Sequence, residues 1–270
     1  MKLRRSKTVF VTGATGLLGR HLQRSSAAQQ FEIVAPGSSL LDIRHRARVL
    51  EMIADWKPQA VVHLAYRQDD GRTIVDGSRN VAEAAAACGA RLVHVSTDVV
   101  FPGRVEPYTE SDPTFPITDY GRMKAEAELA VMAACPTAVM VRTSLMYGTE
   151  IISRPQLEVQ QALRGESSMA FFTDEYRCPA HAADIAAACA TLTTMPEIVG
   201  PLHVAGPQAL SRAELATAFA RWLGMNPALL RTTSLSTSGS ARPGRLVLDS
   251  SRAGALGLHC RPIAAGLGLR

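Results

Sequence analysis

The 270-residue sequence has no long apolar run, no low-complexity segment and no internal repeat. No stretch approaches the roughly 18 apolar residues that a membrane-spanning helix requires, so we expect no membrane association. The five cysteines are widely spaced and form no CxxC motif, which argues against a disulfide framework and fits a reducing cytoplasm. Neither they nor the seven histidines have the spacing of metal ligands, so no metal is expected.

Charge of one sign is not concentrated along the chain, whose net charge is only +5. The one basic cluster, formed by Lys2, Arg4, Arg5 and Lys7, precedes the first expected strand. Such a cluster is more often a solvated end than a nucleic-acid arm, so no nucleic-acid partner is expected. A basic start followed at once by a strand is also unlike a signal peptide. We therefore expect a cytoplasmic protein, whose mildly cationic surface would suit an anionic nucleotide.

Short apolar runs alternate with helical stretches over the first two thirds of the chain. The expected strands are residues 8–12, 31–35, 60–64, 91–96 and 138–143, and the expected helices are residues 17–28, 46–56, 75–88 and 120–134. Val-rich strands separated by helices are typical of a parallel sheet that is covered on both faces. The sequence predicts the α/β class, with a Rossmann-type doubly wound parallel sheet.

Beyond Tyr147 the alternation weakens. We expect a helix over residues 184–192, a strand over 201–204 that returns to the sheet, and a loop over 232–245. A further helix over 211–223 has a capping box, because Glu214 follows Ser211 by three residues, and Gly224 ends it. These features predict a first domain over residues 1–148, rejoined by about 182–205, and a small carboxyl-terminal lobe over 149–181 and 206–270.

The segment Gly13-Ala14-Thr15-Gly16-Leu17-Leu18-Gly19 lies between the first strand and the first helix. Its glycines permit a tight turn and a close approach of backbone to a pyrophosphate, which the helix amino-terminus would attract. The spacing is GxxGxxG rather than the standard GxGxxG, and a glycine turn that only begins a helix is the alternative. We expect the first domain to bind a dinucleotide and the smaller lobe to bind the substrate.

The end of the second strand bears on the choice of cofactor. NAD sites usually have an acidic residue about 20 positions beyond the glycines, and this chain has Ser38 and Ser39 there instead. With Arg20, these serines could face a 2′-phosphate, so we expect NADP (NADPH) to be preferred, with NAD possible. We expect Asp42 either to reach the adenine edge of the cofactor or to cap the following helix.

Tyr120 and Lys124 lie four residues apart, on one face of an expected helix. A lysine cation stabilises a neighbouring phenolate; lowering the tyrosine pKa by about three units corresponds to roughly 4 kcal/mol. The YxxxK spacing arises often by chance, so its position matters more. It follows a strand that ends in Ser96-Thr97-Asp98, at the sheet edge where doubly wound folds bind ligands. We expect Thr97, Tyr120 and Lys124 to be catalytic, with Thr97 bonding a substrate carbonyl.

Eight motifs that span nearly the whole chain carry a family resemblance. They are GATGLLG (13–19), LLDI (40–43), STDVVFPG (96–103), PYTESDP (107–113), YGRMK (120–124), VRTSLMYG (141–148), HVAGPQALSRAE (203–214) and RPGRLVLDSSRA (242–253). The chain resembles the extended short-chain dehydrogenases/reductases of the NAD-dependent epimerase/dehydratase superfamily. Within that superfamily it is most similar to the dTDP-4-dehydrorhamnose reductase family of sugar-nucleotide reductases.

The resemblance implies an oxidoreductase that transfers a hydride from NAD(P)H to the C4 ketone of a nucleotide-linked deoxysugar. It assigns proton donation to Tyr120, ribose binding and tuning of the tyrosine to Lys124, and carbonyl orientation to Thr97. The expected cofactor contacts lie in the glycine turn, after the second and third strands and on the catalytic helix: Gly13, Thr15, Gly16, Leu17, Leu18, Gly19, Ser38, Ser39, Asp42, Ile43, Leu64, Ala65, Tyr120 and Lys124. The expected substrate contacts are Asp98, Val100, Arg177 and Arg242.

Three stretches depart from the family pattern. The loop from Ala65 to Thr73 is shorter, the segment 74–78 (IVDGS) lacks the usual Asn, and Leu145 replaces an aromatic residue. Two alternatives therefore stand beside the reductase: an epimerase or dehydratase that retains NAD, and a catalytically inactive, cofactor-binding regulatory subunit.

Several other interpretations stay open at this stage. Arg177 and Arg242 either clamp a diphosphate or lie on the surface. His63 and His94, both in expected strands, are predicted to be hydrogen-bonded core histidines rather than catalytic ones. The expected partner is the nucleotide sugar itself, with a homodimer as an open possibility.

Overall fold

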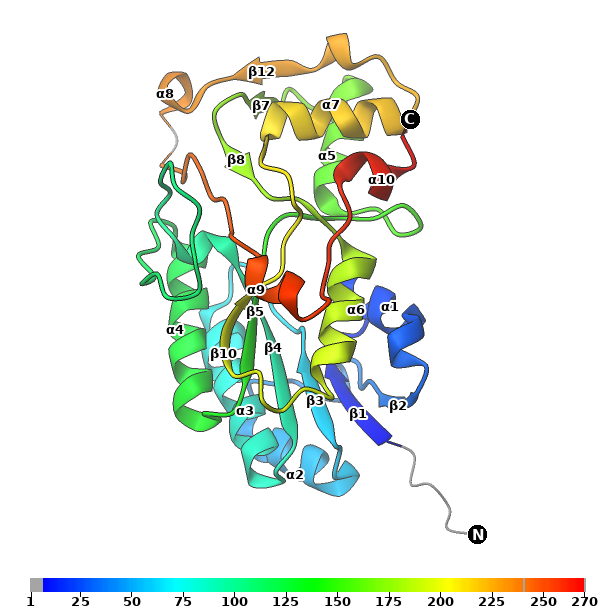
Figure 1. Ribbon diagram of the computed structural model, residues 1–270, viewed down its shortest axis with the longest axis vertical. Coiled ribbons are helices and arrows are strands. Elements are labelled where there is room, and N and C mark those ends of the chain that lie inside the picture. Colours follow the sequence, from blue (N-terminus) through cyan, green and yellow to red (C-terminus); the bar gives the residue numbers. More distant parts are fainter. Residues whose placement is uncertain (1–6, 240, 270) are drawn as a thin grey trace. The chain divides into compact units, whose positions relative to one another are not determined.

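The computed structural model describes residues 7–239 and 241–269, which fold into two compact units (Figure 1). Unit 1 contains the described residues up to Ser96, Arg122–Arg142 and Ala186–Leu202; unit 2 contains Thr97–Gly121, Thr143–Ile185 and the residues from His203 onward. Lys2, Arg4 and Arg5 of the basic cluster lie outside the described residues.

A six-stranded sheet organises unit 1. Its strands are β1 (Lys7–Thr12), β2 (Phe31–Val34), β3 (Ala60–His63), β4 (Arg91–Thr97), β5 (Val139–Thr143) and β10 (Gly200–His203), in the order β10-β5-β4-β3-β1-β2. β1 pairs in parallel with β2 and β3, and β3 with β4. The chain goes from β1 outward to β2 and returns to β3 on the other side, so the strand order reverses between β1 and β3. The predicted doubly wound sheet is confirmed, and the strand after residue 200 returns to it at the edge.

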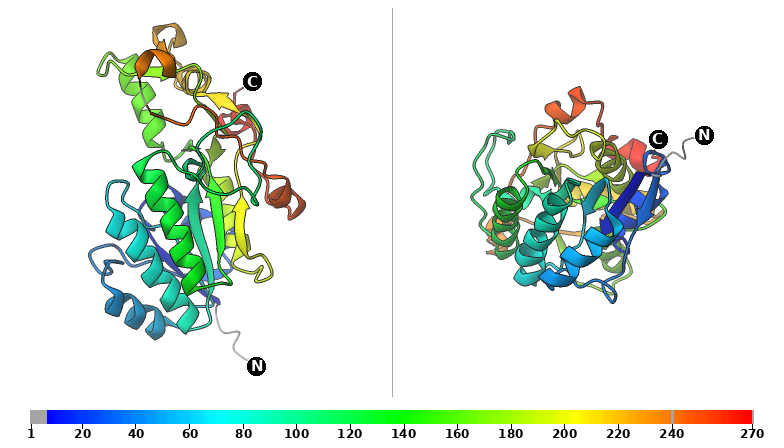
Figure 2. Two further views of the ribbon diagram at one scale, coloured as in Figure 1. Left: turned by 90° about the vertical axis from the view of Figure 1, so that its left-hand side faces the viewer. Right: turned by 90° about the horizontal axis from the view of Figure 1, so that it is seen from below.

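Helices cover both faces of this sheet (Figures 1 and 2). On one face α2 (Arg46–Trp56), α3 (Gly77–Ala87) and α4 (Asp119–Ala134) enclose a core that includes Phe10, Val61 and Leu92. On the other, α1 (Leu17–Arg24) and α6 (Ala182–Leu192) meet the alternate strand residues Val9 and Val62. Each buried Val or Leu contributes roughly 1.5–3 kcal/mol, so strands apolar on both sides favour this double cover.

Two expected helices differ at their ends. The first stops at Arg24, and a separate 3₁₀ turn follows over Ser26–Ala28. The third begins with a π-helical turn over Arg72–Asp76 before α3. At Gly77, where α3 begins, an added Cβ would lie 2.6 Å from Ile43 Cδ1, so any larger residue would force the Ile43 side chain to shift.

Unit 2 is built from short elements around a separate core. The pairings are β6 (Met146–Tyr147) with β9 (Ala180–His181), β7 (Ala170–Phe172) with β12 (Arg231–Thr233), and β8 (Tyr176–Arg177) with β11 (Leu210–Ser211). The helices are α5 (Arg154–Leu163), α7 (Arg212–Trp222), α8 (Leu235–Ser238), α9 (Ser251–Ala255) and α10 (Ile263–Leu267). Tyr147, Phe171, Leu215 and Phe219 form the centre of the core.

The prediction of a continuous loop over residues 232–245 is wrong. The end of β12 and the whole of α8 lie within it. β12 is the polar sequence RTT, which carries no apolar signal and becomes a strand by pairing with β7, from Arg231 opposite Ala170 to Thr233 opposite Phe172.

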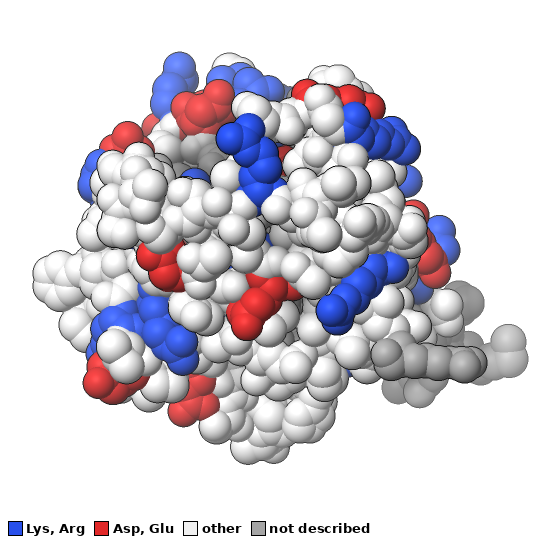
Figure 3. All heavy atoms as spheres, turned by 90° about the horizontal axis from the view of Figure 1, so that it is seen from above, with Lys and Arg blue, Asp and Glu red and all other residues white. Residues whose placement is uncertain are grey.

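Two properties of the described residues bear on the bulk expectations. All five cysteines are free thiols, and none of the helices is long and apolar enough to cross a membrane. Figure 3 shows basic and acidic side chains interspersed on the face that it draws, in keeping with the mild net charge.

The predicted capping box at the start of α7 is confirmed. The Ser211 hydroxyl accepts a hydrogen bond from the Glu214 N–H at 3.1 Å, and the Glu214 carboxylate accepts one from the Ser211 N–H at 2.7 Å. Two N–H groups that a helix start leaves unpaired are thereby satisfied.

Replacing Ser211 tests how much this cap stabilises the protein. Ser211→Ala should lower the free energy of unfolding by about 1 kcal/mol, because the helix start loses its hydroxyl acceptor. Urea denaturation followed by circular dichroism measures the change. Glu214→Gln keeps an acceptor for the Ser211 N–H and is the control, with a smaller loss expected. Equal losses in the two variants would contradict the assignment.

Candidate functional site

The three glycines of the turn after β1 differ in what an added side chain would meet. Gly13 has a φ of +71°, and an added Cβ there would lie 2.6 Å from the Ala65 nitrogen. At Gly19 an added Cβ would collide with the Ala14 backbone. Gly16 is exposed, and a Cβ would meet only the Gly13 carbonyl oxygen at 3.4 Å. Gly13 and Gly19 are therefore required by packing, whereas Gly16 leaves open space at the surface.

The amino-terminus of α1 has the character of an anion site. Gly16 occupies the N-cap position of α1. Within the described chain no side-chain hydrogen bond caps this helix, and its first turn contains no acidic residue. Free N–H groups and the partial positive charge of a helix start attract phosphate groups. Thr15 and Gly16 are exposed beside this helix end, while Leu18 and Gly19 are buried in the core behind it. These residues fit the diphosphate of a dinucleotide.

A buried hydrogen-bonded chain supports the turn from below. Thr12 Oγ1 lies 2.6 Å from His63 Nδ1, and His63 Nε2 lies 3.0 Å from Ser78 Oγ. The Ala65 N–H also donates to Thr12 Oγ1 at 3.3 Å. The chain thus links β1, β3 and α3 where Gly13 packs against residues 64 and 65, both expected cofactor contacts. Sequence reasoning missed Thr12 and Ser78.

The two strand histidines differ in their surroundings. Burial, followed by the charge of Lys124, lowers the pKa of His63 to about 3, so its ring is neutral, and its hydrogen bonds confirm the prediction of a satisfied core histidine. The same prediction is wrong for His94, whose two ring nitrogens are buried without a hydrogen-bond partner in the described structure. Burial lowers its pKa well below the usual range, and its ring centre lies 5.2 Å from that of His63.

The segment after β2 contains the residues expected near the adenosine end of a cofactor. Ser38 and Ser39 are exposed there. A side-chain hydrogen bond from Arg44 is the main cause that lowers the pKa of Asp42 to about 2, and the ion pair between these residues spans 2.7 Å. Because α2 begins at Arg46 with His45 at its cap position, the helix-cap alternative for Asp42 is wrong.

The backbone of Ile43, in the same segment, is held in place by a residue that the sequence analysis missed. The Asn80 side chain of α3 donates a hydrogen bond to the Ile43 carbonyl oxygen at 2.9 Å. Both residues are buried. Asn80 thus fixes the LLDI segment against α3.

Lys124 is buried on α4, one helical turn after Tyr120. Only 5% of Lys124 is exposed, and its Nζ donates a hydrogen bond to the Val95 carbonyl oxygen of β4 at 2.8 Å. Burial lowers the pKa of Lys124 to about 8, against an opposing effect of the Glu128 carboxylate. The lysine that the sequence singled out is therefore a cation held in a poorly solvated place, where its charge acts strongly on neighbouring groups.

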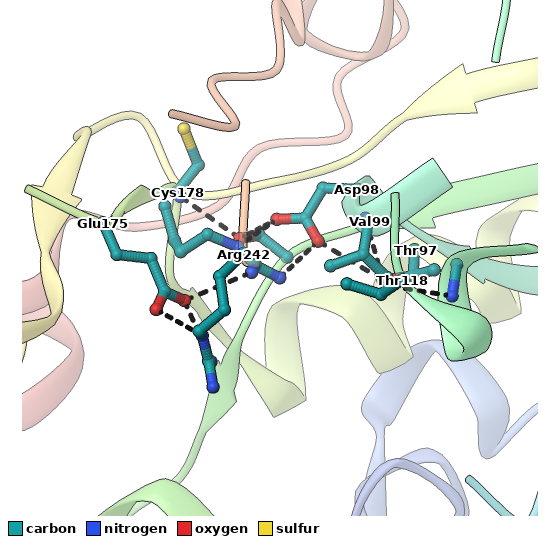
Figure 4. Close-up of polar contacts among 10 residues, drawn as sticks. Thr97, Asp98, Val99, Thr118, Glu175, Cys178 and Arg242 are labelled. Atoms are coloured by element: carbon teal, nitrogen blue, oxygen red, sulfur yellow. Dashed lines mark hydrogen bonds and ion pairs between the residues drawn. The ribbon is translucent and has the colours of Figure 1, made fainter. Parts of the chain in front are cut away.

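The segments that carry Thr97 and Tyr120 pack directly on one another (Figure 4). Gly121 makes this possible, because an added Cβ would collide with the Val99 carbonyl oxygen. Thr97 ends β4, and its Oγ1 accepts a hydrogen bond from the Val99 N–H at 3.4 Å. Thr118 Oγ1 accepts one from the Gly121 N–H at 3.1 Å, at the start of α4. The glycine within the YxxxK segment is thus a packing requirement.

Asp98, an expected substrate contact, is a fully buried centre of hydrogen bonds (Figure 4). Arg177 donates to both carboxylate oxygens, from Nε at 2.8 Å and from Nη2 at 2.6 Å. The Ser144 hydroxyl donates a third bond at 2.6 Å. Asp98 and Arg177, separated by 79 positions, thus form a bidentate pair inside unit 2. Val100 is also buried. Direct substrate contact by these three residues stays a prediction.

Arg242 extends this group of charges toward the surface. Its Nε donates to Glu175 Oε2 at 2.9 Å, and its guanidinium lies 5.4 Å from the centre of the Phe172 ring. Glu175 is buried and also lies 3.6 Å from Arg177, whereas 46% of the Arg242 side chain is exposed. Of the four expected substrate contacts, Arg242 is the one with a large exposed part.

Unit 2 also contains a cavity of about 460 Å³ that the sequence analysis did not predict. It is lined by the segments 205–207, 247–251 and 258–260, with Pro107, Cys178, Ala209 and Gly254, and by none of the predicted site residues. Across residues 7–239 and 241–269, no group of three or more His, Cys, Asp or Glu side chains could hold a metal ion.

The burial of Lys124 predicts a pH dependence of stability. Its pKa is about 8 in the folded protein and 10.5 in its ordinary state. Between these values the unfolded chain binds more protons, so stability rises with pH; the penalty is complete below pH 8 and gone above 10.5. Lys124→Met removes the penalty. The free energy of unfolding of the parent minus that of the variant should therefore rise by up to about 3 kcal/mol from pH 7 to 10.5.

Urea denaturation of the two proteins across this pH range measures the difference. The exposed Lys7 gives the matched control Lys7→Met. A constant difference between the parent and Lys124→Met would refute the burial penalty.

Comparison with known proteins places this chain in a family. Residues 7–267 match the family model described as RmlD substrate binding domain. The chain is 35% identical to dTDP-4-dehydrorhamnose reductase of Streptomyces griseus, over 93% of this chain and 88% of that one. It is 30% identical to methionine adenosyltransferase 2 subunit beta of Mus musculus, over 97% and 86%.

A solved structure agrees with these sequence matches. The structure of dTDP-4-dehydrorhamnose reductase from Bacillus anthracis in complex with NADP has a TM-score of 0.86 and 26% identity, over 97% of this chain and 98% of that one. The resemblance inferred from the sequence is confirmed: the chain belongs to the RmlD substrate binding domain family.

Proposed function

We propose that this chain is an NADPH-dependent reductase of a nucleotide-linked 4-keto-deoxysugar. The observation that carries the proposal is the buried Lys124 one helical turn after Tyr120, on a helix whose start packs against the segment that follows Thr97. A buried ammonium group beside a phenol stabilises the phenolate and so lowers the pKa of the phenol. The relatives support the same activity, since the family includes proteins named dTDP-4-dehydrorhamnose reductase.

The cofactor is expected to bind with its diphosphate at the start of α1. Thr15 and Gly16 are exposed there, and the N–H groups of the first turn have no competing side-chain cap in the described chain. The exposed Ser38 and Ser39, with the exposed Arg20, would meet a 2′-phosphate. This set, which lacks a carboxylate, favours NADPH over NADH. The similar enzyme from Bacillus anthracis was solved with NADP.

The chain's own residues would then carry the proton chemistry. A bound nicotinamide supplies the hydride that adds to the carbonyl carbon. Tyr120 gives its phenolic proton to the carbonyl oxygen, and Lys124 stabilises the phenolate that remains. Thr97 donates a hydrogen bond that orients the carbonyl. The product is the sugar alcohol, and solvent returns a proton to Tyr120.

We assign the two halves of the reaction to different parts of the chain. Residues 1–148, with about 182–205, would bind the dinucleotide, and residues 149–181 and 206–270 the sugar nucleotide. Arg242 is the best candidate for the substrate diphosphate, because its side chain is half exposed while Glu175 fixes its position. Asp98, Val100 and Arg177 are the other proposed substrate contacts. A cytoplasmic location fits the five free thiols, and a homodimer stays a prediction.

The central test is the activity of the parent protein and of Tyr120→Phe. The parent should oxidise NADPH when given a dTDP-4-keto-6-deoxysugar, and the variant should lose at least about 100-fold in kcat because it has no proton to give. NADPH affinity, measured by fluorescence titration, should remain within a few-fold. Unchanged turnover in Tyr120→Phe would exclude Tyr120 as proton donor.

The cofactor site is tested by Gly16→Ala. An added Cβ would have only one ordinary contact, at 3.4 Å, and the φ of −72° suits alanine, so the fold should keep its stability. The methyl group would instead occupy the space where the diphosphate lies, and NADPH affinity should fall at least about tenfold. Gly254→Ala in α9 is the matched control, because its Cβ would also have only ordinary contacts. Unchanged NADPH affinity in Gly16→Ala would contradict this site.

A non-catalytic subunit is a second candidate function, favoured by the relatives named methionine adenosyltransferase 2 subunit beta. It predicts NADPH binding without turnover on any ketosugar, together with retention of a methionine adenosyltransferase in a pull-down. An epimerase or dehydratase is the third alternative from the sequence. It predicts NAD that co-purifies and is not consumed.

A further inference from the structure

Glu128 lies on the same face of α4 as Tyr120 and Lys124. These residues are spaced by four, so each follows the previous one by about one helical turn. The Glu128 side chain is only 6% exposed. A carboxylate is costly to bury, and the proposed chemistry gives this one no proton or substrate to handle. Its contacts therefore need an explanation.

Glu128 connects α4 to two neighbouring strands of the sheet. From β5, Arg142 donates to the carboxylate through Nε at 3.0 and 3.2 Å and through Nη2 at 2.7 Å. From β4, the Ser96 hydroxyl donates to Oε1 at 2.5 Å. The bidentate arginine fixes the plane of the carboxylate, and the serine fixes its position along β4.

Lys124 is attached to the same strand one residue earlier. Its Nζ donates to the carbonyl oxygen of Val95, directly before Ser96. Two successive turns of α4 are thus bound to two successive residues of β4, immediately before Thr97. Together the two contacts restrain both the position of the helix along the strand and its rotation against it.

Glu128 also acts on the charge of Lys124. Burial lowers the pKa of Lys124, and the Glu128 carboxylate is the group that opposes this effect. Other titratable groups in this environment are His63 of β3 and His94 of β4, both held neutral by burial, and Arg142, which pairs with Glu128. Tyr120 precedes Lys124 by one turn of the same helix. Glu128 is therefore the acidic group that favours the ammonium form.

We propose that Glu128, held by Arg142 and Ser96, is a positioning residue that keeps Lys124 protonated and fixes α4 in the setting that catalysis needs. This inference rests on the proposed reductase function. A purely structural ion pair has a different signature. Replacing a buried pair by apolar residues of similar size often leaves stability unchanged or raises it, so a structural role predicts a folded and fully active apolar variant.

The test compares the parent with the double variant Glu128→Met/Arg142→Met, which removes both charges without leaving one unpaired. The chain contains four lysines, so proteins labelled with ¹³C at the lysine side chain give few signals, and Lys124→Met identifies that of Lys124. In the double variant the midpoint of the Lys124 titration should move to lower pH. With NADPH and a dTDP-4-keto-6-deoxysugar, kcat should fall at least about tenfold and the alkaline limb of its pH profile should shift the same way.

Two further variants complete the experiment. Ser96→Ala removes only the hydrogen bond between Glu128 and β4. It should lower kcat by less than the double variant does, and the alkaline limb of the pH profile should remain almost in place. Glu126→Met, an exposed glutamate on the same helix, is the matched control and should behave like the parent. A folded double variant whose Lys124 midpoint or kcat equals that of the parent overturns the inference. A parent protein without turnover overturns the proposed function instead, and the Lys124 titration then decides the inference.

Discussion

The candidate site depends on how polar groups near the ends of the buried parallel strands are paired inside unit 1. Helices cover both faces of the sheet, so a hydroxyl, imidazole or ammonium near a strand end cannot rely on water. Thr12 is paired through His63 to Ser78, and Lys124 is paired to the backbone of Val95. Each such bond fixes a strand end relative to the helix beside it.

Close backbone contacts act together with these bonds. Gly13 permits the turn after β1 to lie against residues 64 and 65, and Gly121 permits the start of α4 to lie against the Val99 carbonyl group. In both places a methyl group would force the segments apart. The glycines therefore position the cofactor turn and the Thr97–Tyr120 region in the same physical manner. Both glycines permit a close backbone approach that a side chain would block, and Gly13 also has a positive φ, which glycine adopts without strain.

Buried charge is handled differently in the two units. In unit 1 the charges of Glu128 and Arg142 compensate one another, and the Glu128 carboxylate also raises the pKa of Lys124. In unit 2 four side chains form a row of alternating charges, from the fully buried Asp98 through Arg177 and Glu175 to the half-exposed Arg242. Such rows are weak stabilisers but strong orienting devices, because removal of one member leaves a buried charge unpaired. Arg242 is thus presented to solvent from a fixed base.

The sequence by itself determined the fold class and the sheet strands, and it singled out Thr97, Tyr120 and Lys124 as candidate catalytic residues. Val-rich runs at regular intervals, the glycine turn and the Tyr120–Lys124 spacing are local signals, and local signals survive in a one-dimensional sequence. Only the tertiary structure decided which polar residues are partners. Asp98 and Arg177 were expected as separate substrate contacts and His94 as a hydrogen-bonded histidine, and no sequence signal singled out Glu128. Their roles depend on residues 14 to 79 positions away and on burial, neither of which a single sequence states.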